Sequence, residues 1–192
     1  MKINNILIII AIIVILFAIL SFNYPKNIPD NNIPNNNNSS GNNSQGTLNL
    51  SNKNLSFFNT NSISNKNQVL ILNLSNNQLK SLPAEIGEFT NVKELYLDNN
   101  ILEGALPAEI RKMSNLKILS AKNNKLTGIP AEIGQLNYLT MIDFSNNNID
   151  TMPNEIGNLK NNLKTLNLSG NKYSAEKIQE IKTMLPNTNI IY

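Results

Sequence analysis

The chain has 192 residues, of which 40 are Asn, and its 16 Lys and Arg against 13 Asp and Glu give a formal net charge of +3. It contains no Cys and no His, which excludes a disulfide framework, a cysteine nucleophile and a zinc-finger type site. Only 15% of the residues are charged and Arg111 is the single Arg, which argues against nucleic-acid binding because that function needs clustered Lys and Arg.

Residues 1–22 form a strongly apolar N-terminal segment. Fifteen apolar residues run without a break from Ile6 to Leu20, and with the next two residues they would make roughly 25 Å of helix, against about 30 Å for a hydrocarbon core. Lys2 places positive charge before the run, on the cytoplasmic side by the positive-inside rule. We favour an uncleaved signal anchor, because Ile19 spoils the best cleavage site, after Ser21; a cleaved signal peptide is the alternative. Both interpretations predict that the remaining chain lies outside the cytoplasm.

Residues 23–46 consist mainly of Asn, Pro, Ser and Gly. Such a segment cannot bury enough apolar surface to offset its ordering entropy, so we expect a disordered linker between membrane and domain. Residues 47–68 follow as a degenerate repeat, in which Leu48, Leu50 and Leu55 match the later repeats but Lys53 replaces their Asn. We expect this stretch to form an N-terminal cap.

Residues 69–173 contain five repeats in register, and this periodicity is the strongest signal in the sequence. The repeats follow the pattern LxxLxLxxNxL and begin at Val69, Val92, Leu116, Leu139 and Leu163. Their recurrent Asn residues are 23, 24, 23 and 24 positions apart: Asn77, Asn100, Asn124, Asn147 and Asn171. The segments that connect the repeats read SLPAEIGEF, ALPAEIRKM, GIPAEIGQL and TMPNEIGNL.

From about Thr47 to Tyr192 these motifs resemble the leucine-rich-repeat family, and the LPxEIG form is similar to 23-residue repeats of Ras-pathway scaffolds, plant proteins and many bacterial proteins. The resemblance implies an α/β solenoid, which is curved, carries short parallel strands on its concave face and ends in a C-terminal helical cap. It also implies that each recurrent Asn binds backbone groups at a turn, so we interpret the five as a structural ladder rather than as ligands.

Strand alternation supports the same fold. In each L-x-L both Leu point to one side, so Leu72 and Leu74 are expected to stack on Leu95 and Leu97, and so on through the repeats. A Pro fixes φ where each return segment begins. Four Glu recur on the outer, convex side, and we interpret them as a solvated row near short helix N-termini: Glu85, Glu109, Glu132 and Glu155.

Residues 174–192 are predicted to close the C-terminal end of the solenoid. Ser174 can cap a helix whose apolar positions, Ile178, Ile181 and Leu185, lie at helical spacing. Residues 189–192 are predicted to add an edge strand after this helix.

Alternation also predicts which side chains are exposed on the concave face. Four of them are apolar or aromatic and three are acidic, which suits a protein interface with apolar anchors and a charged rim. The candidate partner-binding residues are Ile71, Asn73, Glu94, Tyr96, Asp98, Ile118, Ser120, Lys122, Met141, Asp143, Thr165 and Asn167.

We therefore expect a non-catalytic protein-binding module, exported and tethered to a membrane, that recognises a partner protein through its concave face. Without His or Cys the usual general base and nucleophile are missing, and no phosphate-binding loop occurs, so we expect no cofactor, no metal and no small-molecule substrate. Two alternatives stay open: a secreted effector or adhesin that acts on a host, and a regulatory subunit of an enzyme.

Overall fold

The structure is a computed structural model that describes residues 46–192. The predicted leader, 1–22, and all but the last residue of the predicted linker, 23–46, lie outside the described residues. Among residues 46–192, no helix is both long enough and apolar enough to span a membrane.

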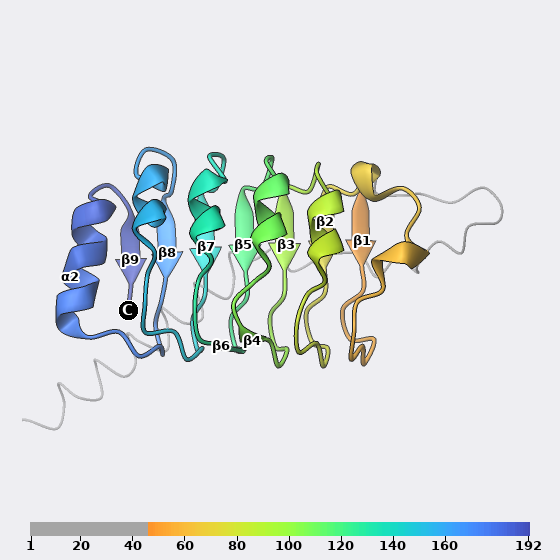
Figure 1. The fold of residues 1–192 in the computed structure, drawn as a ribbon, viewed down its shortest axis with the longest axis horizontal. Helices are drawn as coiled ribbons and strands as arrows, with labels where there is room; N and C mark the ends of the chain where they lie inside the picture. Colours follow the sequence, from red (N-terminus) through yellow and green to blue (C-terminus); the bar gives the residue numbers. More distant parts are fainter. Residues whose placement is uncertain (1–45) are drawn as a thin grey trace, which may run out of the picture. The chain divides into compact units, whose positions relative to one another are not determined.

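A seven-stranded parallel sheet runs through the described residues, with one short strand contributed by each coil of the chain (Figure 1). Its order is β1-β2-β3-β5-β7-β8-β9, so each strand pairs with the next one along the repeats. The strands are β1 (Thr47–Asn49), β2 (Ile71–Asn73), β3 (Glu94–Tyr96), β5 (Ile118–Ser120), β7 (Met141–Asp143), β8 (Thr165–Asn167) and β9 (Asn189–Ile191). The pairing keeps equivalent residues opposite one another, as with Leu72 and Leu95, which confirms the predicted parallel strands.

Short 3-10 helices form a second layer, which lies in front of the sheet in Figure 1. They are η1 (Thr60–Ser62), η2 (Lys66–Gln68), η3 (Ala84–Glu88), η4 (Ala108–Lys112), η5 (Ala131–Gln135) and η6 (Asn154–Leu159). From η3 on, each follows a Pro with extended ψ and carries a Glu in its first turn. Two further strands, β4 (Glu103–Gly104) and β6 (Lys125–Leu126), make a separate parallel pair that the sequence pattern does not predict.

The core lies between these two layers. Leu72, Leu74, Leu95 and Leu97 are fully buried from the sheet side, and the Ile of each return segment, such as Ile86, is fully buried from the helix side. Burying one such side chain contributes about 1.5–3 kcal/mol. A single coil cannot cover its own Leu, so this gain is reached only when coils stack.

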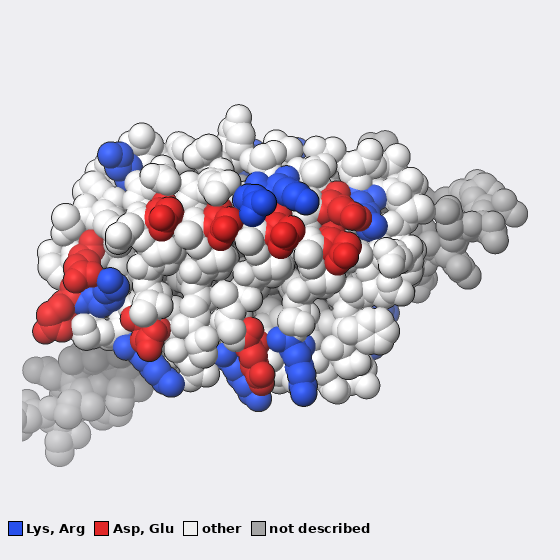
Figure 2. Space-filling model, viewed as in Figure 1, with Lys and Arg blue, Asp and Glu red and all other residues white. Residues whose placement is uncertain are grey.

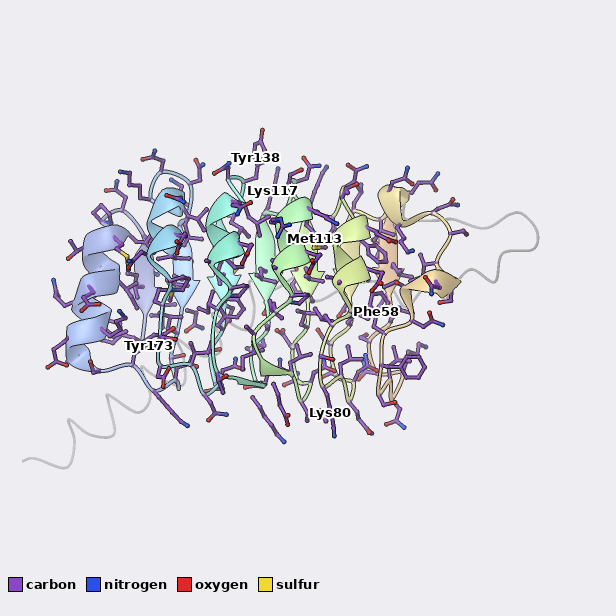
Figure 3. All side chains as sticks on the ribbon, in the orientation of Figure 1. Phe58, Lys80, Met113, Lys117, Tyr138 and Tyr173 are labelled. Carbon is purple, nitrogen blue, oxygen red and sulfur yellow. The ribbon has the colours of Figure 1, made fainter. Side chains whose placement is uncertain are left out.

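Both ends of the stack are covered. At the C-terminal end, helix α2 (Ala175–Met184) begins at Ser174, whose side chain accepts a hydrogen bond from Lys177 N at 3.2 Å. Its Ile178 and Ile181 are buried against the last coil, and β9 adds the final strand, so the predicted helical cap is found. In the first coil Phe58, labelled in Figure 3, stacks on Phe89 with ring centroids 5.8 Å apart.

Candidate functional site

The side of the sheet that faces away from the 3-10 helices, here called the sheet face, carries three rows of side chains. In the six strands β1, β2, β3, β5, β7 and β8, the first residue forms the first row: Thr47, Ile71, Glu94, Ile118, Met141 and Thr165. The third residue forms the second row: Asn49, Asn73, Tyr96, Ser120, Asp143 and Asn167. The residue two positions later forms the third row: Ser51, Ser75, Asp98, Lys122, Ser145 and Ser169. All twelve candidate residues belong to these rows.

Amide and carboxylate side chains in the second row bond to the backbone that follows their own strand. Asn73 Oδ1 accepts from Ser75 N at 2.9 Å. Asp143 Oδ1 accepts from both the amide and the hydroxyl of Ser145, at 2.9 and 2.7 Å. Asn167 does the same with Ser169, at 3.1 and 2.8 Å. These side chains therefore stabilise the end of the strand, a local use that is typical of Asn and Asp.

In the fourth coil the second row carries Ser120, which has no amide or carboxylate oxygen to accept from the backbone. The carboxylate of Asp98, in the third row of the preceding coil, takes this role. Its Oδ1 accepts from Ser120 Oγ at 2.5 Å and from Lys122 N at 3.2 Å, and Lys122 Nζ lies 3.6 Å from its Oδ2. Burial raises the pKa of the Asp98 carboxyl above its ordinary value, although the bonds from Ser120 and Lys122 act in the opposite direction. One carboxylate thus links the third coil to the fourth.

The expectation that all twelve candidates are exposed is wrong for five of them. Asn73, Tyr96, Asp98, Ser120 and Asp143 are buried. Strands in a sheet are only about 4.8 Å apart, so neighbours on the adjacent strands can enclose side chains such as these five. The Tyr96 ring also lies along its own strand, since its hydroxyl donates to Glu94 Oε2 at 2.7 Å.

Every first-row candidate reaches solvent, whereas most candidates in the other two rows are buried. Ile71, Ile118 and Met141 are half-buried there, as are Glu94 and Thr165. Glu94 lies between Ile71 and Ile118 in the register. The remaining two candidates, Lys122 and Asn167, are also half-buried. The row offers apolar contact area interrupted by one carboxylate, which suits a protein surface more than a reacting substrate.

The recurrent Asn residues bond backbone groups inside each turn. Asn124 Nδ2 donates to Leu97 O and Ala121 O at 3.0 and 3.1 Å, and its Oδ1 accepts from Leu102 N at 3.0 Å. The same pattern recurs at Asn77, Asn100, Asn147 and Asn171. Each amide therefore joins its own coil to the preceding coil, through both its donor and its acceptor.

Sequence reasoning missed a second Asn ladder, formed by the residue before each recurrent Asn. Asn76, Asn99, Asn123 and Asn146 have φ between 54° and 58°. Each of the last three donates its Nδ2 to the Oδ1 of the member before it, at 2.8, 2.7 and 2.8 Å. Asn tolerates a left-handed backbone better than most residues, and Gly170 takes the equivalent place at φ 71°. The sequence signal for this ladder was the Asn-Asn doublet of the first four repeats, which becomes Gly-Asn in the fifth.

The face formed by the 3-10 helices carries a row of acidic side chains (Figure 2). These include the four predicted Glu in the first turns of η3 to η6. Over residues 46–192, no three His, Cys, Asp or Glu are placed to hold a metal ion together. Glu85 and Glu155 are exposed and Glu109 and Glu132 are half-buried, so the row is in contact with solvent.

Comparisons with known proteins agree with this architecture. A family model described as leucine rich repeat matches residues 90–149 and 114–172, and a second model of that description matches residues 68–89 and 162–184. No curated protein matches the chain.

Several solved structures are similar. A leucine-rich-repeat protein of Leptospira interrogans matches with a TM-score of 0.65 and 32% identity over 77% of this chain and 43% of that chain. A plant peptide hormone receptor in complex with RGF2 matches with a TM-score of 0.52 and 37% identity, over 65% and 20%. An internalin of Listeria monocytogenes shares the fold, with a TM-score of 0.56 and 20% identity over 65% and 35%. The chain spans less than half the length of each.

Proposed function

Because this chain belongs to the leucine-rich-repeat family, we propose that it is a non-catalytic module that binds a partner protein through the first row of the sheet face. The observation that carries the proposal is the half-buried apolar set Ile71, Ile118 and Met141, with Glu94 between two of its members. Apolar anchors beside a charged group are what hot spots of protein interfaces contain.

The similar structures support the proposal at the level of the fold. The plant receptor structure is a complex with RGF2, so a related solenoid does bind a partner. The match covers 20% of that receptor, so it supports binding by the solenoid and not a particular partner.

A pull-down with a matched control tests the sheet face. The test variant carries Ile71→Lys, Ile118→Lys and Met141→Lys, and the control carries three lysines at exposed positions away from the sheet face, Ser81→Lys, Thr127→Lys and Thr151→Lys. We expect the test variant to lose the partner and the control to retain it. Equal recovery by both would rule out the first row as the binding surface.

The proposal has a second part, which is that the module is exported and stays tethered to a membrane. Its support is the apolar run from Ile6 to Leu20 and the polar residues that follow it. The intact mass of the mature protein separates an uncleaved anchor from a cleaved leader. A measured mass that lacks residues 1–21 would show that the leader is cleaved. The module would then be secreted rather than tethered.

A further inference from the structure

One backbone hydrogen-bond ladder follows the edge at which the strands begin, here called the entry edge. In each step an amide donates to the carbonyl of the preceding coil, at 2.6 to 2.9 Å. The ladder passes through the residues that precede successive strands: Gly46, Leu70, Lys93, Lys117, Thr140 and Lys164. It therefore places side by side residues that are more than twenty positions apart in the sequence.

Six exposed basic side chains gather at the entry edge. Three belong to the ladder, and three lie at the C-terminal ends of η4 and η6, where the chain returns to this edge: Lys93, Lys117, Lys164, Arg111, Lys112 and Lys160. Figure 3 shows Lys117 at this edge together with Tyr138, whose side chain is 62% exposed. Among the described residues none of the six forms an ion pair, whereas Glu88, at the end of η3, is paired with Lys66.

The other surfaces do not share this excess of positive charge. Along the opposite edge, where Lys80 is labelled in Figure 3, lysines alternate with acids in successive coils: Lys80, Glu103, Lys125, Asp150 and Lys172. The face of the 3-10 helices carries the acidic row (Figure 2). The net charge of +3 therefore conceals a separation of charge, with most of the positive excess on the entry edge.

The chain also enters the solenoid at this edge. Gly46 accepts hydrogen bonds from Leu70 N and Ile71 N, at 2.6 and 2.9 Å, and is the first member of the ladder. The linker expected from the sequence, 23–46, therefore ends at the entry edge. If the apolar segment 1–22 holds the protein in a membrane, the chain that comes from the membrane joins the domain at the entry edge.

We propose that the entry edge docks on a membrane surface that contains anionic phospholipid, an inference that rests on the tethering part of the proposed function. The lysines contact headgroup phosphates, and Tyr138 lies at the interface between headgroups and hydrocarbon, where Tyr is enriched in membrane proteins. Docking on this edge keeps the acidic row off the lipid and leaves the sheet face open to a partner.

The strength of this contact follows from the number of basic side chains. Each Lys or Arg close to an anionic membrane surface raises partitioning by about fivefold, and salt screens the effect within roughly 10 Å at moderate ionic strength. A tethered domain starts at the surface, so a small contribution from each of the six side chains is enough to hold one orientation.

Lysine labelling of the full chain in vesicles tests the proposal with a control inside the same molecule. An amine-reactive reagent is added to the protein in phosphatidylcholine vesicles and in vesicles that also contain phosphatidylglycerol, and modified lysines are quantified by mass spectrometry. We expect anionic lipid to slow labelling of Lys93, Lys117 and Lys164 by roughly fivefold or more. Labelling of Lys80, Lys125 and Lys172 should stay unchanged, and high salt should abolish the difference.

A matched pair of variants separates the effect of the entry-edge lysines from the effect of the total charge of the protein. Lys93→Gln, Lys117→Gln and Lys164→Gln together should remove the protection of the two remaining entry-edge lysines, Lys112 and Lys160. The control variant, Lys80→Gln, Lys125→Gln and Lys172→Gln, has the same net charge and should keep that protection.

The outcomes distinguish this proposal from the tether on which it rests. Association with neutral vesicles without protection of the entry edge by anionic lipid would overturn the proposal and leave the tether standing. Protection by anionic vesicles of a chain that does not associate with neutral ones would refute the tether and keep the docking edge. Equal protection at both edges, or protection by RNA or an acidic protein but not by lipid, would also overturn the proposal.

Discussion

At the scale of single residues, the two Asn of each Asn-Asn doublet have different physical roles. Asn124 is buried, and its amide bonds four backbone groups. Asn123 is exposed, has φ 55° and bonds mainly to the equivalent side chains of the coils on either side. The first role depends on the donor and acceptor of the amide, and the second on a backbone conformation that Asn and Gly tolerate.

Asn124→Ala tests the first role. The substitution removes the partner of Leu102 N and one of the two amide donors to Leu97 O, which keeps its bond from Asn100 Nδ2, and a buried backbone group left unpaired costs about 1–3 kcal/mol. We expect the free energy of unfolding in urea to fall by roughly 3 kcal/mol. The control is Asn123→Gly, which keeps an allowed backbone and should cost about 1 kcal/mol or less. Equal losses for the two variants would contradict the assignment.

Asp98→Asn tests the buried carboxylate through the pH dependence of stability. Burial raises the folded-state pKa of Asp98, so the folded protein holds this proton more tightly than the unfolded chain does. The protonated Asp98 side chain therefore contributes its full stabilisation at pH values below the pKa that this carboxyl has in the unfolded chain. That contribution is lost as the pH rises through the pKa that it has in the folded protein.

The Asn side chain does not ionise and can still accept hydrogen bonds from Ser120 and Lys122 N. We therefore expect the variant to gain stability relative to wild type as the pH is raised from acidic to neutral. Urea unfolding of both proteins over this range measures the difference. A difference that does not change with pH would show that the carboxylate has no net desolvation cost.

At the scale of elements, glycines permit close packing of neighbouring 3-10 helices. A Cβ on Gly134 in η5 would lie 2.2 Å from the carbonyl oxygen of Glu155 in η6, and one on Gly87 in η3 would lie 2.5 Å from that of Glu109 in η4. Arg111 occupies the equivalent position in η4 and is exposed. At Gly87 and Gly134 the G of the LPxEIG motif is therefore a packing requirement between neighbouring coils.

Gly134→Ala is expected to destabilise the solenoid, because the blocking atom is backbone and cannot rotate away. Overpacking of this kind costs about 1–3 kcal/mol, measured as the shift in the midpoint of urea unfolding. Gly128→Ala is the matched control, since a Cβ there meets no atom within 4 Å. Because alanine reduces the freedom of the unfolded chain, the control should change stability by less than about 1 kcal/mol, toward higher stability.

At the scale of the whole molecule, stability depends on contacts between adjacent coils and on caps that cover the two terminal layers. Helix α2 buries Ile178, Ile181 and Leu185 on the last coil, where the sheet would otherwise expose its final Leu residues. Loss of the cap should therefore loosen the C-terminal coils first and the central coils later.

Ile181→Ala tests this dependence. The side chain is fully buried, and removing its buried carbons should cost about 2–5 kcal/mol. Hydrogen exchange should rise in β8 and β9 before it rises in β2 and β3. Glu180→Ala, an exposed change on the same helix, should leave both stability and exchange nearly unchanged. A uniform rise of exchange along all the strands would contradict the capping role.

The sequence alone determined the repeat, its strands, its core and its cap. A period of 23 or 24 residues with Leu at alternating positions admits one way to bury every Leu, so register and topology follow from the pattern. The hydrogen-bonding role of Asn77 and its equivalents could also be predicted, because a buried amide between two strands needs donors and acceptors.

Only the tertiary structure decided which polar side chains of the sheet face are accessible and where the basic charges gather. Alternation specifies the side of the sheet to which Asp98 points, but not that Ser120 of the next coil will bond it and enclose it. Likewise, Lys93, Lys117 and Lys164 are far apart in the sequence and become neighbours of one edge through the hydrogen bonds between coils. The pattern within one repeat sets which way a side chain faces, whereas its burial and its charged neighbours depend on residues one or more coils away.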